Sequence, residues 1–212
     1  MRFSVAVGFV LLCAAPAHAE VVATAENGFV IRQAAEVTAG PDEVWSQLLK
    51  PGAWWSDKHS YSGDSANLTI DPRGGGCFCE VLPSAVSPRA APRGSVEHMR
   101  VVYAESPRVL RMSGALGPMQ SEAVQGTLTV ALKPVDGGTR IMWEYVVGGY
   151  MRQKIDLMAP VVDSVLGEQL SQLAAKLGPR ASTAPPEAEA KPRAAPLPAP
   201  VPAKPKRPVE GR

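Results

Sequence analysis

Cysteine is scarce in this chain, which has three among 212 residues. Cys13 lies in the apolar N-terminal segment, so only Cys77 and Cys79 are left for a folded domain. Two cysteines are too few for the disulfide framework that holds many small secreted domains together. We therefore expect the stability of the fold to come mainly from an apolar core.

A run of apolar residues long enough to span a membrane is also missing at the N-terminus. The apolar segment from Phe3 to Ala15 is shorter than the roughly 20 residues that a membrane-spanning helix needs. Arg2 precedes it and Ala17-His18-Ala19 follows it, an order of charged, apolar and small residues that is typical of a secretory signal. We predict a signal peptide over residues 1–19, cleavage before Glu20, no transmembrane segment, and a periplasmic or secreted location.

The central part of the chain lacks an excess of positive charge. The whole chain has a formal net charge of +2. Residues 178–212 hold seven Lys and Arg against three Glu, and Arg2 adds one positive charge, which leaves residues 20–177 at −3. A domain that binds nucleic acid needs a basic face. Nucleic acid is therefore not expected as a partner.

The segment from Gly178 to Arg212 lacks the residues that build a core. It holds ten prolines, no aromatic residue and three large aliphatic residues, namely Leu197, Val201 and Val209. Such a segment buries too little apolar surface to offset the entropy of ordering it, so we predict a disordered Pro/Ala-rich tail. Its positive charge would allow a weak contact with an anionic surface, and a solvated linker is the simpler alternative.

Residues 20–177 have the length of one compact domain, and their patterns predict an α+β fold. Alternating apolar and polar residues predict strands at 29–38, 76–82, 95–103, 109–113, 126–132 and 139–147, with a weaker strand at 68–70. Pro41 opens a short helix that ends at Pro51. An apolar stripe predicts the main helix from Pro160 to about Leu177, after a short turn, because proline interrupts helices. Short connectors such as Asp136-Gly137-Gly138 favour an antiparallel meander.

Three segments carry a resemblance to a known superfamily. They are Ala39-Gly40-Pro41-Asp42-Glu43-Val44-Trp45, Trp54-Trp55-Ser56, and residues 137–143. With the order of elements over residues 28–177, they resemble the START-like (SRPBCC) superfamily, which includes polyketide cyclases, lipid-transfer domains and heat-shock-protein ATPase activators. The resemblance implies a helix-grip fold, a curved antiparallel sheet wrapped around a long C-terminal helix. It also implies an internal cavity for a small apolar or amphipathic molecule, and it specifies no activity.

Eight side chains are candidates for the ligand site. They are Trp54, Trp55, His59, Tyr61, Glu97, Met99, Tyr103 and Trp143. The first four follow the short helix, a region that lies near the cavity mouth in the superfamily, although aromatic residues there could equally fill the core. Glu97, Met99 and Tyr103 share one face of the predicted strand 95–103, which would place His98 and Arg100 on the outer face.

Glu97 permits two interpretations. Inside the cavity, its carboxylate could serve a cyclase or hydratase as a general acid or base, together with His59 or Tyr61. At the rim, it would be paired and solvated, because a one-residue slip in register turns every side chain to the other face. No catalytic residue is assigned, because a nucleophile elbow, a phosphate loop and a dinucleotide fingerprint are all missing, and no cofactor is expected. An interaction protein that uses its proline-rich tail is the third alternative.

Cys77 and Cys79 share one face of the predicted strand 76–82, and three states remain open for them. They could be packed or free thiols. They could form a disulfide, which needs a bulge or strain because an ideal strand holds the two residues badly for bridging. They could bind metal with His59 and His98, although Cys-x-Cys lacks the spacing of structural zinc sites, so no metal site is predicted.

Overall fold

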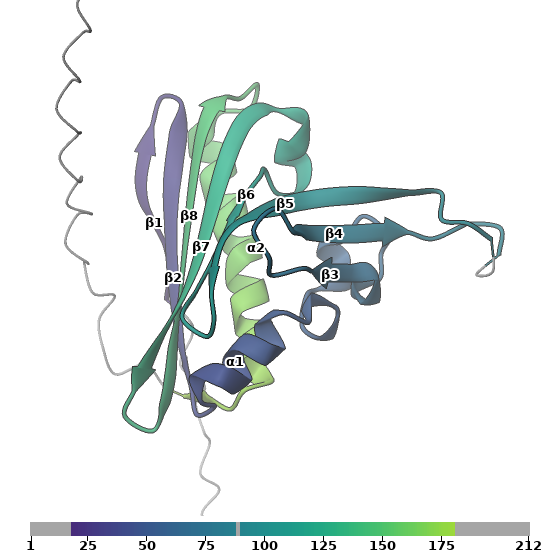
Figure 1. The fold of residues 1–212 in the computed structure, drawn as a ribbon. Helices are drawn as coiled ribbons and strands as arrows, with labels where there is room; N and C mark the ends of the chain where they lie inside the picture. The colour runs from purple at the N-terminus through teal and green to yellow at the C-terminus, as the bar shows by residue number, and fades with distance from the viewer. Residues whose placement is uncertain (1–17, 88–89, 181–212) are drawn as a thin grey trace, which may run out of the picture.

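The computed structural model of the protein describes residues 18–87 and 90–180 (Figure 1). Within them, nine strands form one antiparallel sheet. The strands are β1 (His18–Ala25), β2 (Gly28–Val37), β3 (Leu68–Ile70), β4 (Cys77–Leu82), β5 (Gly94–Glu105), β6 (Val109–Ser113), β7 (Ala123–Val135), β8 (Gly138–Tyr150) and β9 (Pro179–Arg180). The helices are α1 (Pro41–Leu48) and α2 (Ile155–Ala175), with 3₁₀ turns η1 (Pro51–Ala53), η2 (Asp57–His59), η3 (Ser65–Asn67) and η4 (Gly117–Ser121).

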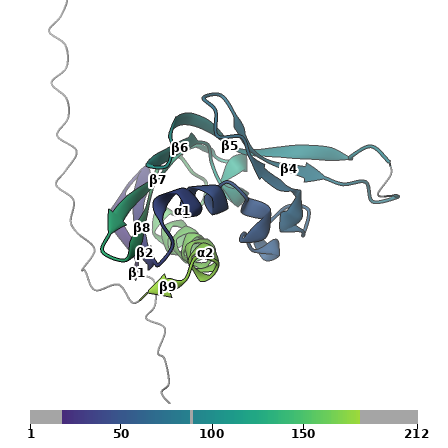
Figure 2. The ribbon, with the colours of Figure 1, turned by 60° about the horizontal axis from the view of Figure 1, so that its bottom comes forward.

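The sheet order is β1-β2-β8-β7-β6-β5-β4-β3, and β9 adds to the outer edge of β2. Strands β4 to β8 follow one another as a meander, as the short connectors predict. The sheet bends around α2, which lies across its concave face (Figure 2). The predicted α+β helix-grip fold is therefore confirmed.

The core lies between α2 and the inner face of the sheet. Leu166, Leu170 and Leu173 on α2 are almost fully buried, at the four- and three-residue spacing of one helix face. Ile141 and Tyr145 on β8 are equally buried, and because they are four residues apart they lie on the same face of the strand. These buried residues form the apolar core that the sequence predicts.

Helix α2 begins earlier than the sequence predicts. It runs without interruption from Ile155, and Pro160 lies inside it. The expected break at Pro160 is wrong because a proline in the second turn removes only one backbone hydrogen bond and constrains only the turn before it. The extra turn carries Met158, which becomes part of the functional site described below.

Two β-bulges in β5 change the faces that its residues occupy. The register with β4 shifts between Phe78 and Cys79, where His98 is the extra residue of β5, and the register with β6 shifts at Val102. As a result His98 and Met99 are both buried, and Tyr103 is 45% exposed. The prediction that His98 faces outward and Tyr103 inward is wrong, because each bulge reverses the alternation beyond it.

The structure has two strands beyond those that the sequence predicts, one near each end of the described residues. Strand β1 was not expected from the sequence, and β9 uses Pro179 and Arg180 from the start of the predicted tail. Most of the predicted signal peptide and residues 181–212 of the predicted tail lie outside the described residues. In the part of the chain that the structure describes, no helix is long and apolar enough to cross a membrane.

Candidate functional site

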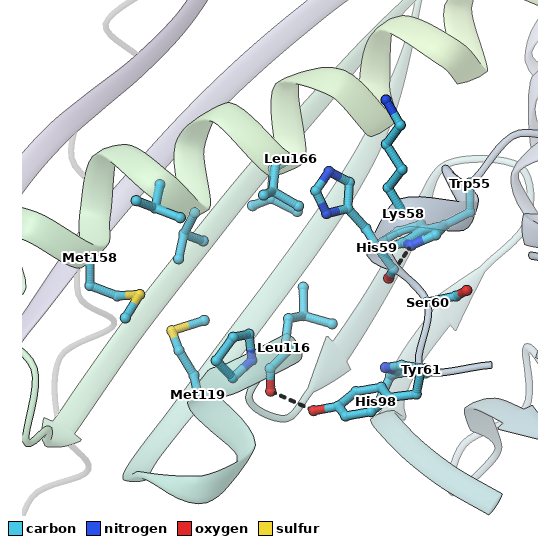
Figure 3. A pocket seen from close by; sticks show the side chains of 15 residues that line it. Trp55, Lys58, His59, Ser60, Tyr61, His98, Leu116, Met119, Met158 and Leu166 are labelled. Carbon is cyan, nitrogen blue, oxygen red and sulfur yellow. Dashed lines mark hydrogen bonds between the residues drawn. The ribbon is translucent and has the colours of Figure 1, made fainter. Parts of the chain in front are cut away.

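A pocket of about 400 Å³ lies between the first half of α2, the 114–121 loop with its η4 turn, and the segment that follows α1 (Figure 3). Its lining residues are Trp55, Lys58, His59, Ser60, Tyr61, His98, Leu116, Gly117, Pro118, Met119, Met158, Val161, Val162, Val165 and Leu166. Val161 is 57% exposed and Tyr61 is 49% exposed, so the pocket opens to solvent. The superfamily resemblance implies an internal cavity, and the structure has a pocket that opens to solvent instead.

One wall of the pocket is an apolar face of α2. Met158, Val162 and Leu166 recur every fourth residue, which places them one above the other on the helix surface. Leu116 and Met119 face them from the 114–121 loop (Figure 3). Met158 and Met119, on opposite sides, give the pocket a flexible, polarisable surface that adapts to irregular ligands.

The opposite end of the pocket is built by residues 54–61. Trp54 Nε1 donates to the Gln47 carbonyl oxygen at 3.0 Å, and Trp55 Nε1 donates to the His59 carbonyl oxygen at 3.0 Å. Trp55 also packs edge-on against Phe78, with ring centroids 5.3 Å apart. Both indole N–H groups are satisfied locally, so these rings fix the segment against the sheet.

Glu80 and His98 form a buried pair that contacts the backbone at the end of this segment. Glu80 Oε2 accepts from His98 Nε2 at 2.9 Å and from the Tyr61 backbone N–H at 3.0 Å, and Glu80 Oε1 accepts from the Ser62 backbone N–H at 2.5 Å. Burial alone would raise the pKa of Glu80, but the hydrogen bonds from Ser62, Tyr61 and His98 outweigh it and hold that pKa below its usual value. Burial lowers the pKa of His98, against the opposing effect of the Glu80 carboxylate. Both shifts favour a carboxylate beside a neutral imidazole.

At the mouth of the pocket, His59 and Lys58 lie close to α2. His59 Nε2 and Glu168 Oε2 are 3.0 Å apart, and both side chains are partly exposed. Hydrogen bonds from Ser56 and His59 hold the pKa of Glu168 below its usual value. Lys58 is exposed at the mouth, and its positive charge also helps to lower the pKa of Glu168.

Two tyrosines hold the 114–121 loop in place. Tyr61 Oη donates to the Gly117 carbonyl oxygen at 2.9 Å (Figure 3). Tyr145 Oη donates to the Gly114 carbonyl oxygen at 3.1 Å and accepts from the Leu116 backbone N–H at 3.2 Å. Burial raises the pKa of Tyr145 to about 12, so the phenol keeps its proton. A Cβ on Gly114 would lie 2.6 Å from the His98 carbonyl oxygen, so glycine is required where the loop meets β5.

The structure brings three of the eight predicted site residues to this pocket, namely Trp55, His59 and Tyr61. Trp54, Met99 and Trp143 are buried in the core, where Trp54 packs edge-on against Trp143. Tyr103 lies outside, where its hydroxyl donates to Glu105 Oε2. A ligand-binding role for the pocket residues stays a prediction.

Glu97 lies away from the pocket. It is 47% exposed and pairs with Arg100 at 2.5 Å. The interpretation that places its carboxylate inside a cavity is wrong, and Glu97 is instead paired and solvated, although not at the rim of the pocket. The bulge at His98 is the physical reason, because it turns the residue beside Glu97 inward while Glu97 stays outward.

Sequence reasoning missed Glu80 and His98 as site residues. Phe78 and Glu80 are two residues apart on β4, so they share its inward face. The alternation of β4 therefore indicates that the Glu80 carboxylate is buried. No comparable signal marks His98, because its orientation depends on the bulge. The apolar stripe of α2 predicts the helix but not the pocket, which its residues Met158 to Leu166 help to line.

Cys77 and Cys79 form a disulfide, one of the three states that the sequence leaves open. Their Cα atoms are 5.3 Å apart, within the range that a disulfide accepts. The bulge in β5 lies opposite the disulfide. Its extra residue, His98, stands between Glu97 and Met99, which pair with Cys79 and Phe78. Among the described residues, no group of three or more His, Cys, Asp or Glu side chains could hold a metal ion.

Comparison with known proteins places the fold in a family. The family described as polyketide cyclase / dehydrase and lipid transport matches residues 29–178. Of the solved structures, 177 chains match, and three examples show the level of similarity. A protein from Rhodobacter sphaeroides is 20% identical over 76% of this chain and 97% of its own, with a TM-score of 0.47.

The other two examples are equally distant. CalU16 from Micromonospora echinospora is 19% identical over 70% of this chain and 74% of its own, with a TM-score of 0.44. CV1439 from Chromobacterium violaceum is 16% identical over 71% of this chain and 98% of its own, with a TM-score of 0.47. No curated protein matches the chain. The match over residues 29–178, together with the helix-grip fold, shows that the chain belongs to the polyketide cyclase / dehydrase and lipid transport family of the START-like (SRPBCC) superfamily.

Proposed function

We propose that this protein is an exported module that binds one small apolar or amphipathic molecule in the pocket between α2 and the 114–121 loop. The observation that carries the proposal is the pocket itself, about 400 Å³ in volume, with apolar walls and polar groups gathered at one end. Ligand sites typically have this composition, in which apolar area supplies affinity and a few polar groups fix orientation. Membership of a family described by lipid transport and cyclisation supports the same proposal.

Export is the second part of the proposal. The charged, apolar and small residues of the N-terminal segment support cleavage after Ala19. A mature chain that starts at Glu20 would keep six of the β1 residues, Glu20 to Ala25. The intact mass of protein recovered from the periplasm or the medium tests this point. A mass that includes residues 1–19 would contradict it.

Native mass spectrometry of the mature protein, beside a denatured sample, tests for a bound molecule. We expect a non-covalent small mass that is lost on denaturation, and its identity would give the ligand class. Purified protein with no such mass, and with no affinity for apolar probes, would contradict the binding proposal.

A pair of variants on α2 links any bound mass to this pocket. Val161 lines the pocket and Leu157, one turn earlier, does not, although both are more than half exposed. Val161→Trp should narrow the pocket and lower ligand occupancy at least tenfold, with little effect on folding because the site is exposed. Leu157→Trp is the matched control and should bind as the unaltered protein does. Equal loss in both variants would indicate a different binding place.

A cyclase or hydratase activity is the alternative that the pocket favours second. His59, Tyr61 and His98 all line it, so titratable groups could reach one bound molecule, although Glu97 no longer contributes. The two functions differ in what happens to the ligand. A molecule that is recovered unchanged after incubation supports binding, whereas one that gains or loses a water supports catalysis. An interaction through the proline-rich tail concerns residues mainly outside the described ranges.

A further inference from the structure

The hydrogen bonds around Glu80 fix the tautomer of His98. Glu80 is fully buried, and two of its three partners are the backbone N–H groups of Tyr61 and Ser62, which can only donate. A carboxylate in that setting is an acceptor, so His98 Nε2 must supply a hydrogen at 2.9 Å. In a neutral imidazole with its proton on Nε2, the other ring nitrogen carries a lone pair and accepts hydrogen bonds.

That acceptor, His98 Nδ1, is not paired within the described part of the chain. No other residue there donates to it, and the atom itself is not fully buried. His98 itself lines the pocket. Since the side chain is only 5% exposed, the pocket is the space from which a partner can reach Nδ1. Burial also lowers the pKa of His98, which keeps the lone pair available near neutral pH.

The other polar side chains that line the pocket are either paired or exposed to solvent. Tyr61 Oη donates to the Gly117 carbonyl oxygen, Ser60 Oγ donates to the Asp57 carbonyl oxygen, and His59 Nε2 is held by Glu168. Lys58 is exposed at the mouth, where water solvates it. His98 Nδ1 differs from them because its side chain is almost fully buried, so leaving it unpaired beside an apolar ligand costs free energy.

We propose that the ligand carries a hydroxyl group, as an alcohol or phenol does, and that this hydroxyl donates a hydrogen bond to His98 Nδ1. The inference rests on the proposed binding function and names the ligand class. The apolar body of the ligand packs between Met119 and Leu116 on one side and α2 on the other. A carboxylate is disfavoured at this position, because its oxygens would face the Nδ1 lone pair with the Glu80 carboxylate close behind.

Three probes of similar shape test the proposal by calorimetry on the mature protein. They are 1-naphthol, 1-methylnaphthalene and 1-naphthoate. We expect 1-naphthol to bind about tenfold more tightly than 1-methylnaphthalene, as one net hydrogen bond predicts, and 1-naphthoate to bind no better than 1-methylnaphthalene. His98→Phe should remove the preference for 1-naphthol. Glu97→Gln, one residue away on the outer face, is the matched control and should keep it.

Imidazole ¹⁵N resonances of the unaltered protein give a second measurement that does not depend on a variant folding. The Nδ1 resonance of His98 should have the shift of an unprotonated nitrogen and should move when 1-naphthol is added, with a smaller change for 1-methylnaphthalene. Equal affinities for these two probes would overturn the inference and leave the binding function standing. Tighter binding of 1-naphthoate would overturn it in favour of an anionic ligand held by Lys58. Failure of all three to bind would overturn the inference, and it would overturn the binding function too if native mass spectrometry also finds no bound mass.

Discussion

At the scale of single residues, the buried Glu80 shapes the site more than any other charged group that the structure describes. It is fully buried, and it ties His98 on β5 to the backbone of Tyr61 and Ser62 on the segment after α1. These three bonds offset the cost of burying a charge. They also orient the imidazole, so the position of one carboxylate decides which atom of His98 faces a ligand.

The first prediction concerns this carboxylate. Glu80→Gln puts an amide N–H₂ group among N–H donors and should lower the free energy of unfolding by about 3 kcal/mol. Urea denaturation measures the change. Glu97→Gln is the control, because Glu97 forms only a surface ion pair with Arg100, and such pairs contribute little. A similar small effect for both variants would show that the buried pair is not a stabilising element.

The second prediction is a loss of stability on acidification. In the unfolded chain His98 takes up a proton near its ordinary pKa of 6.5, whereas in the folded protein its pKa is lowered. Below pH 6.5 the unfolded state therefore binds more protons, so the free energy of unfolding falls as the pH falls from 7.5 to 5.5. The lowered pKa of Glu80 acts in the same direction below pH 4.5.

Denaturation curves at several pH values test this, with two histidine variants for comparison. His98→Phe should flatten the dependence between pH 7.5 and 5.5. His59→Phe, at the partly exposed mouth, should retain it. An unaltered slope in His98→Phe would assign the acid sensitivity to another group.

At the scale of elements, the pairing of β4 with β5 decides the site. Cys77 and Cys79 have Cα atoms 5.3 Å apart, shorter than the roughly 6.6 Å that two steps of a regular strand cover. Directly opposite, β5 holds one extra residue, His98, in its bulge. We interpret the disulfide and the bulge as one irregularity shared by two strands, with the result that His98 faces Glu80.

The third prediction follows from this shared irregularity. Replacing both cysteines, as Cys77→Ser with Cys79→Ser, should cost roughly 1.5 kcal/mol of unfolding free energy, the value for closing so short a loop. It should also shift the His98 imidazole resonances, because the strand can lengthen. Dithiothreitol should bring the unaltered protein to the level of the variant and leave the variant unchanged. Unaltered His98 resonances in the variant would show that the bulge is independent of the disulfide.

At the scale of the whole molecule, the residues that follow α2 form hydrogen bonds with the edge of the sheet. The Thr38 backbone N–H donates to the Gly178 carbonyl oxygen at 2.8 Å, and β9 pairs with the end of β2. Arg180 Nη1 also donates to the Asp136 carbonyl oxygen at 2.7 Å, in the turn between β7 and β8. Residues Gly178 to Arg180 therefore connect the end of α2 to β2 and to the turn between β7 and β8.

The fourth prediction compares two truncations. A chain that ends at Arg180 keeps these contacts, whereas a chain that ends at Leu177 loses them. We expect the shorter chain to unfold at a Tm lower by about 4 °C, which corresponds to one or two net hydrogen bonds. Calorimetric scans of the two truncated proteins measure the difference. Equal Tm values would show that β9 does not contribute to stability.

The sequence by itself determined most of the fold. Strands such as β2 and β8 and the helix α2 are visible as local periodicity, because the side chains on one face of a strand or helix recur at fixed spacing. The same local patterns carry the family resemblance, which the match over residues 29–178 confirms. They also indicate the segment with Trp55, His59 and Tyr61, which the structure places at the pocket.

Only the tertiary structure decided which polar groups face the pocket. Alternation along β5 assigns Glu97 to the inside and His98 to the outside, and the structure has the reverse. The reason is that a bulge is a property of two paired strands, and neither strand reveals it alone. Glu80 becomes a site residue for the same reason, because a buried carboxylate is tolerated only where donors from distant segments converge on it, and that convergence exists only in the folded chain.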